Sequence, residues 1–162
     1  MNYNLGSGTI LLKDYKNLDK KDLDLNKDIS LSDLPDNKET IMYNIVEHLD
    51  NPYKTIIEIG NTMKKGSILK IKTPTFFSSP SIVHKQNLFN DRYFRMLCGY
   101  NPETCDGINM FKEIKIKYMR QKKFIGFAFI DFLIKIKRFI LSMWNREIYF
   151  EFEKNYDYDN NK

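Results

Sequence analysis

Two histidines are the side chains of this chain best suited to exchange a proton near neutral pH. They are His48 and His84, the only two in the sequence. Because an imidazole titrates close to neutrality, either could act as a general base or anchor a substrate. His84 lies in a loop after a predicted strand. His48 could equally cap a strand and position the helix that follows.

A glycine-containing loop near the start is a second candidate for ligand binding. Gly6, Ser7 and Gly8 come directly after Leu5, which ends a short apolar segment. Glycines let the backbone approach a ligand closely, because no Cβ is in the way. A Gly-Ser-Gly run on its own is also an ordinary turn, so this loop needs support from the rest of the chain.

The cysteines do not indicate a metal centre. Cys98 and Cys105 are the only two, and their spacing matches neither a disulfide framework nor a metal motif. Together with His84 they would supply three zinc ligands, but no fourth ligand is evident. We therefore expect free, partly buried thiols and no metal.

The elements that must position these residues alternate between strands and helices. Strands are expected at 2–5, 15–19, 22–29, 40–46, 68–73, 108–119 and 147–153. Only about six residues separate Gly8 from Tyr15, whereas a strand-helix-strand crossover needs about a dozen or more. The first helix of a standard unit is therefore expected to be missing.

Three helices are expected between the later strands. Asn51 can cap a helix that has Pro52 at its first position, and Gly66 is expected to end it. A short helix is expected at 91–99 and a longer one, with one narrow polar stripe, at 122–145. Residues 1–154 are expected to form a single domain, followed by a polar tail at 155–162.

Basic residues gather in the C-terminal half of the chain. The segment 112–146 is rich in Lys and Arg, but its only acids are Glu113 and Asp131. It could face nucleic acid, an anionic membrane or an acidic substrate, or be merely solvated. The helix 122–145 is too short in its charge-free part to span a bilayer, but it could lie in the membrane interface. No nucleic-acid motif accompanies it. The start of the chain lacks the pattern of a signal peptide, so a cytoplasmic location is expected.

Four stretches, in this order and spacing, resemble the class I S-adenosylmethionine-dependent methyltransferases. They are residues 4–8, 28–36, 41–52 and 64–74. The chain looks most like the small, methyltransferase type 11-like branch, which lacks the first helix. The resemblance implies an α/β fold. Its sheet would be Rossmann-like and mostly parallel, with flanking helices, a shortened N-terminal unit and an antiparallel last strand.

The resemblance also implies roles for individual residues. The loop from Leu5 to Gly8 would hold the amino-acid end of S-adenosylmethionine, and Asp19 would bind the ribose hydroxyls. Asp28 and Ile29 would meet the adenine. Asn44 and Glu47 would face the cofactor. Both histidines would lie on the substrate side, and the resemblance favours His84 as the base or substrate anchor. The implied reaction is methyl transfer to an unidentified acceptor, with a small molecule or glycan favoured over nucleic acid.

The chain departs from the family before the predicted strand 68–73. The family's usual Lys-Pro-Gly-Gly run is replaced here by residues 64–67. Gly60 also lowers helix propensity by about 1 kcal/mol relative to alanine. The shortened glycine loop and the changed Lys-Pro-Gly-Gly run support one rival, a non-catalytic binding module that keeps the fold. The other rival is a basic peripheral protein acting at membranes or on RNA.

Overall fold

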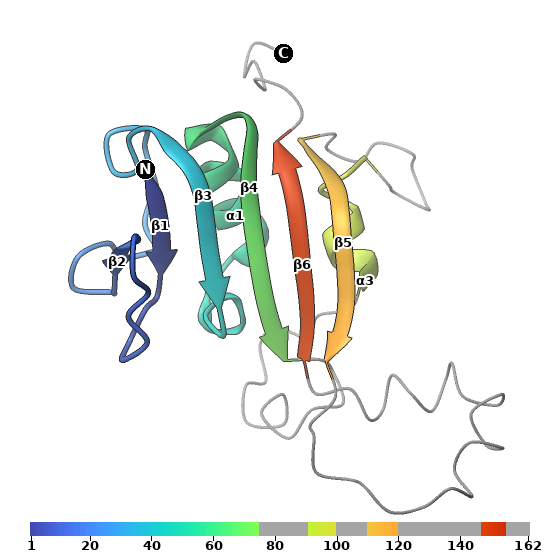
Figure 1. The fold of residues 1–162 in the computed structure, drawn as a ribbon, viewed down its shortest axis with the longest axis horizontal. Coiled ribbons are helices and arrows are strands. Elements are labelled where there is room, and N and C mark those ends of the chain that lie inside the picture. The colour runs from blue at the N-terminus through green and yellow to red at the C-terminus, as the bar shows by residue number, and fades with distance from the viewer. Residues whose placement is uncertain (75–90, 100–109, 120–146, 155–162) are drawn as a thin grey trace, which may run out of the picture.

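The computed structural model describes residues 1–74, 91–99, 110–119 and 147–154. Within them, six strands form one sheet in the order β2-β1-β3-β4-β6-β5 (Figure 1). The strands are β1 (Asn2–Leu5), β2 (Lys16–Leu18), β3 (Asn37–Tyr43), β4 (Met63–Pro74), β5 (Phe111–Met119) and β6 (Glu147–Lys154). The helices are η1 (Val46–His48), α1 (Pro52–Thr62) and α3 (Asp91–Arg95).

The pairing of the strands confirms the predicted fold class. β1 is parallel to both β2 and β3, and β3 is parallel to β4. β6 is antiparallel to its two neighbours, β4 and β5. No helix separates β1 from β2, as the short spacing predicted. The protein is thus an α/β protein with a mostly parallel sheet, a shortened N-terminal unit and an antiparallel last strand.

The predicted strand at 22–29 is wrong. This segment forms turns, because short polar side chains bond to the backbone beside them. Asp22 accepts a hydrogen bond from the Asp19 amide at 3.1 Å, and Asp24 accepts one from the Asn26 amide at 3.2 Å. The hydrophobic residues that suggested a strand are partly or fully buried from this irregular path.

The predicted end of the first long helix is also wrong. α1 ends at Thr62 rather than at Gly66, and β4 begins at the next residue. The Thr62 hydroxyl donates to the Ile59 carbonyl at 2.7 Å and accepts from the Asn37 amide group at 3.1 Å. These bonds pair polar groups in the last turn of α1 and attach that turn to β3, so the helix ends before Gly66. Gly66 lies inside β4 instead, with a φ of 80°.

Other boundaries shift by a few residues. The strand expected at 40–46 starts earlier and ends at Tyr43, and the helix expected at 91–99 ends at Arg95. The helix expected at 122–145, the tail 155–162 and His84 lie outside the described residues. Among the residues described, no helix has the length and apolar character needed to cross a bilayer.

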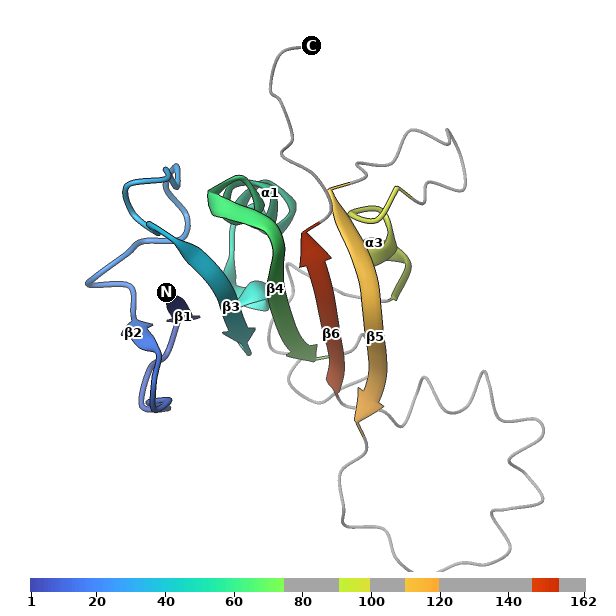
Figure 2. The same cartoon turned by 45° about the horizontal axis from the view of Figure 1, so that its top comes forward.

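The described helices cover only one face of the sheet. Ile56 and Ile59 of α1 are fully buried in one core cluster with Leu69 of β4. Phe94, in α3, packs against Phe150 of β6, with ring centroids 4.1 Å apart. Both helices lie on the same side of the sheet in two views (Figures 1 and 2). The opposite face, as far as the structure describes it, carries no helix.

Candidate functional site

The order of strands in the sheet reverses at β1, because the next strand in the sequence, β2, lies on one side of β1 and the following strand, β3, lies on the other. β1 lies between β2 and β3, so the carboxyl ends of these three strands meet where the order reverses. In open α/β sheets, ligands bind in the crevice at such a switch point. Gly6 directly follows β1, Asp19 directly follows β2, and Ile45 lies two residues after β3.

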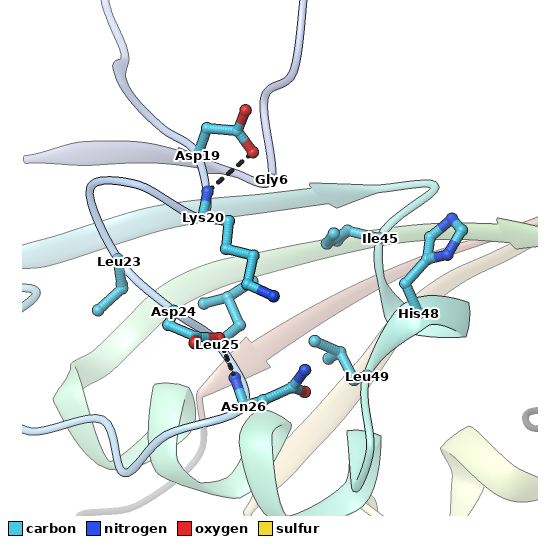
Figure 3. A pocket seen from close by; sticks show the side chains of 10 residues that line it. All are labelled: Gly6, Asp19, Lys20, Leu23, Asp24, Leu25, Asn26, Ile45, His48 and Leu49. Atoms are coloured by element: carbon cyan, nitrogen blue, oxygen red, sulfur yellow. Dashed lines mark hydrogen bonds between the residues drawn. The ribbon is translucent and has the colours of Figure 1, made fainter.

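A cavity of about 160 Å³ lies at this switch point (Figure 3). Its apolar lining comes from Leu23, Leu25, Ile45 and Leu49. Its polar lining comes from Asp19, Lys20, Asp24, Asn26 and His48, with Gly6 between the two sets. Apolar walls with a few convergent polar groups are typical of a small-molecule site.

The glycine loop takes a backbone path that favours glycine at two positions. Gly6 has a φ of 65°, and a Cβ placed there would lie 2.4 Å from Cγ1 of Ile45. Gly8 has a φ of 50°, but open space surrounds the position of its Cβ. Between them, the Ser7 amide donates to the Leu18 carbonyl at 3.1 Å. The loop is thus fixed to β2 at Ser7 and open to ligand at Gly8.

Two asparagines hold the rest of this loop in the place of the missing helix. The Asn4 side chain donates to the Ile10 carbonyl at 2.9 Å and to Oδ1 of Asn17 at 2.8 Å. Asn17 in turn accepts from the Leu12 amide at 2.9 Å and donates to the Leu12 carbonyl at 3.1 Å. Side-chain amides therefore replace helical backbone bonds in positioning the glycine loop.

The wall formed by residues 19–26 is fastened to α1 and to the turn before it. The Thr55 hydroxyl donates to the Leu25 carbonyl at 3.1 Å. The Asp50 amide donates to Oδ1 of Asn26 at 3.0 Å. In Figure 3 the Asp24 and Asn26 side chains lie below Asp19, on the wall that this segment forms. A loop thus occupies the position where a third strand was expected.

The structure brings three of the predicted site residues together around the cavity, namely Gly6, Asp19 and His48. Asp28 is not among the lining residues. It is exposed and forms an ion pair with Lys54, at 2.5 Å, that lowers the pKa of its carboxyl group. Ile29 is buried in the core, and its amide donates to Glu58 at 3.2 Å.

The remaining predicted residues lie near the cavity without lining it. Leu5 and Ser7 are buried on either side of Gly6. Asn44 is exposed, with a φ of 53°, and its amide donates to the Lys72 carbonyl at 2.8 Å. Glu47 is 5% exposed and accepts a hydrogen bond from the Thr73 hydroxyl at 3.1 Å. His84 falls outside the described residues.

The sequence did not predict the four apolar residues of the lining or three of its polar residues, Lys20, Asp24 and Asn26. The Asp-x-Asn spacing of the last two is a turn signature that could have revealed them. Within the described ranges, no group of potential ligands could hold a metal ion. Burial raises the pKa of the Cys98 thiol to about 12, so this cysteine is not a nucleophile at neutral pH.

Comparison with known proteins identifies the fold. No family model and no curated protein matches the sequence. Among solved structures, one match is in a complex between the Haloferax volcanii Trm112 methyltransferase activator and a methyltransferase. The match covers 96% of this chain and 82% of the matched chain, with a TM-score of 0.57 and 11% sequence identity. The chain has the Rossmann-like fold of the methyltransferases. An S-adenosylmethionine-dependent methyltransferase from Archaeoglobus fulgidus matches 94% of this chain and 85% of that one, with a TM-score of 0.48 and 15% identity.

Proposed function

We propose that the protein binds S-adenosylmethionine in the switch-point cavity and transfers its methyl group to an acceptor. The observation that supports this most is the meeting of Gly6, Asp19 and His48 around one cavity at the carboxyl ends of three strands. Distinct segments of the chain supply these residues, in the order that the methyltransferase resemblance implies.

The side chains that line the cavity fit a nucleoside. The Asp19 carboxylate can accept hydrogen bonds from both ribose hydroxyls, and the apolar walls can cover a base. The open space at Gly8 leaves room for the amino-acid end. The volume of about 160 Å³ is below the roughly 300 Å³ of pockets that enclose a whole ligand. We therefore propose that the cavity holds part of the cofactor and that the rest lies over the glycine loop.

The adenine contact has two candidates. The family resemblance favours Asp28 and Ile29, but the cavity lining favours Asp24 and Asn26. Asp28 is already engaged by Lys54. Oδ1 of Asn26 accepts the Asp50 amide, but the amide nitrogen of Asn26 can donate toward a base, and the Asp24 carboxylate beside it can accept from one. We therefore propose Asp24 and Asn26 for this role. Asn44 and Glu47 would support the strand end and the turn behind the cavity.

When bound, S-adenosylmethionine supplies a methyl carbon that is already activated by its sulfonium. The protein's task is then to orient the acceptor and, where the acceptor must lose a proton, to take it. His48 is exposed at the cavity and is our candidate to accept that proton. His84 keeps its proposed role as base or substrate anchor.

The acceptor class proposed on fold-level analogy is a small molecule or a glycan. The proposed location is the cytoplasm, with membrane contact through 122–145 as a further proposal. The rival function is that of a binding module that keeps the cofactor fold without catalysis.

Calorimetric titration with S-adenosylhomocysteine tests the proposal. We expect micromolar binding to the wild type and a loss of at least tenfold in affinity in Asp19→Asn. Asp24→Asn should weaken binding, whereas Asp28→Asn should not. Asp33→Asn, an exposed acid in the turn before β3, is the control for charge. A folded wild-type protein that gives no heat at millimolar ligand would contradict cofactor binding.

A further inference from the structure

The face of the sheet without a described helix carries an ordered set of lysines and tyrosines, here called the open face. One row of paired residues crosses four strands near the edge at which β3, β4 and β5 end and β6 begins, running Tyr43, Lys72, Tyr149, Lys117. Residues directly opposite on neighbouring strands point to the same side of a sheet. The two tyrosine rings meet edge to face, with centroids 6.3 Å apart.

The edge strand β5 adds further lysines to the same face. Lys112, Lys115 and Lys117 pair with Glu153, Glu151 and Tyr149 of β6. A register shift between Glu113 and Lys115 places Lys112 and Lys115 on one side although they are three residues apart. All three lysines are exposed, and no ion pair of theirs occurs in the described part of the chain. Neighbours on one side of a strand are about 7 Å apart, so the three form a line of positive charge.

Three of the four acids that the described strands place on this face are bound to side chains of the face or its rim, and the fourth, Glu153, lies opposite Lys112 in the register. Glu39 bonds to Tyr15 and pairs with Lys70 at 2.8 Å. Glu147 pairs with Lys72 at 3.0 Å. Glu151 accepts a hydrogen bond from the Tyr149 hydroxyl at 3.1 Å. These contacts hold lysine and tyrosine side chains in place and leave the β5 lysines as the available positive charge.

We infer that the open face binds single-stranded nucleic acid. Bases would stack on Tyr43 and Tyr149, and phosphates would pair with the lysines of β5. Proteins that bind single strands combine these same two elements, aromatic platforms beside a basic track. Lysines on an edge strand also prevent sheets from associating, but this role does not account for the tyrosines beside them.

An anionic membrane fits this face less well. Membrane insertion needs exposed apolar side chains. The central aliphatic residue of the face, Ile41, is only 5% exposed. Tyr43 is also two residues from Ile45, which lines the cavity. A strand on this face would therefore pass close to the proposed methyl-transfer site, although its binding does not depend on methyl transfer.

Fluorescence anisotropy with a labelled oligouridine RNA of about 12 nucleotides tests the inference. We expect micromolar binding at about 50 mM salt, weakened roughly tenfold or more at about 200 mM, as three phosphate contacts require. The variant K112E/K115E/K117E should lose at least tenfold in affinity and most of the salt dependence. Tyr149→Leu should lose at least fivefold with the salt dependence unchanged, because it removes stacking alone.

The matched control is K16E/K27E/K38E, which changes the net charge equally. Lys16 is in register with the buried Tyr3, Lys27 lies in the loop beside α1, and Lys38 precedes Glu39 on the other side of β3. The affinity of this control for the RNA should stay within threefold of the wild-type affinity. An equal loss in the control would overturn the inference, since net charge alone would then explain binding. So would no binding by a folded wild type, or binding to phosphatidylserine vesicles but not to RNA.

Discussion

At the scale of single residues, the two glycines of the first loop differ in what they tolerate. Gly6→Ala combines a left-handed φ with a Cβ 2.4 Å from Ile45, whereas Gly8→Ala meets only open space. We expect Gly6→Ala to lower the free energy of unfolding by about 2 to 4 kcal/mol, and Gly8→Ala by about 1 kcal/mol. Urea unfolding of both variants measures this difference. Equal losses would show that the backbone conformation, and not the contact with Ile45, requires glycine.

The ion pair between Asp28 and Lys54 gives a second test at this scale. Lys54 lowers the pKa of Asp28 in the folded protein. The pair therefore contributes to stability above the ordinary carboxyl pKa, and this contribution is lost as the pH falls through the lowered value. In Lys54→Met, an NMR titration should show the Asp28 pKa rising toward its ordinary range. Because neither residue lines the cavity, cofactor affinity should stay unchanged, and a change would place Asp28 in the site.

The sequence could predict some site residues and not others for a clear reason. Gly6 and Asp19 directly follow strands, and His48 ends the short helix η1 after β3, so the resemblance could match these three to positions at the strand ends. Asp24 and Asn26 lie in a segment whose alternating leucines suggested a strand. Their place on the cavity wall depends on tertiary contacts with Thr55 and Asp50, which no local pattern records.

At the scale of elements, the glycine inside α1 has a packing role. Propensity alone makes Gly60 a weakness of the helix, yet a Cβ there would lie 2.4 Å from Sδ of Met110 and 2.8 Å from the Phe111 ring. We expect Gly60→Ala to destabilise the protein by about 1 to 2 kcal/mol, because overpacking exceeds the helical gain of about 1 kcal/mol. Thermal unfolding measures it, and Asn61→Ala on the exposed side of α1 is the control. A stabilised Gly60→Ala would mean that Met110 moves aside freely.

The loop that replaces the first helix depends on Asn17. Asn17→Ala removes its bonds to both backbone groups of Leu12 and to Asn4. We expect a loss of about 1 to 3 kcal/mol, because polar groups that are partly buried lose their partners. Tryptic cleavage after Lys13, in the exposed part of this loop, should become faster. Unchanged cleavage would indicate that the loop is held by other contacts, such as that of Tyr15 with Glu39.

At the scale of the whole molecule, the fold class was predictable because each strand carries its own signal. The short gap between Gly8 and Tyr15 excluded a helix, and the alternation in 147–153 marked a strand. Its antiparallel direction was implied by the resemblance to the methyltransferases. The open face was not predictable in the same way. Lys70, Lys72, Glu147 and Glu151 have the pattern of ordinary solvated positions until the register places them on one side of the neighbouring strands β4 and β6.

The two proposed sites make a joint prediction about stability. S-adenosylhomocysteine at a hundredfold excess over its Kd should stabilise the native state by about 2.7 kcal/mol. For a chain of this length, that corresponds to a rise in Tm of about 5 to 10 °C. Asp19→Asn should abolish this rise, whereas K112E/K115E/K117E should keep it, because the lysines lie on the open face. A rise lost in both variants would mean that the cavity and the open face form one site.

The effect of RNA on the same thermal unfolding transition tests whether RNA is the methyl acceptor or binds only to the open face. If RNA occupies only the open face, its stabilisation should add to that of S-adenosylhomocysteine, because sites that share no residue act independently. If a base of the RNA reaches the cavity as methyl acceptor, each ligand should instead alter the affinity of the other by the same factor. We expect simple addition, since the favoured acceptor is a small molecule or glycan. Coupled binding, measured by titrating cofactor with and without RNA, would make nucleic acid the acceptor and overturn that choice.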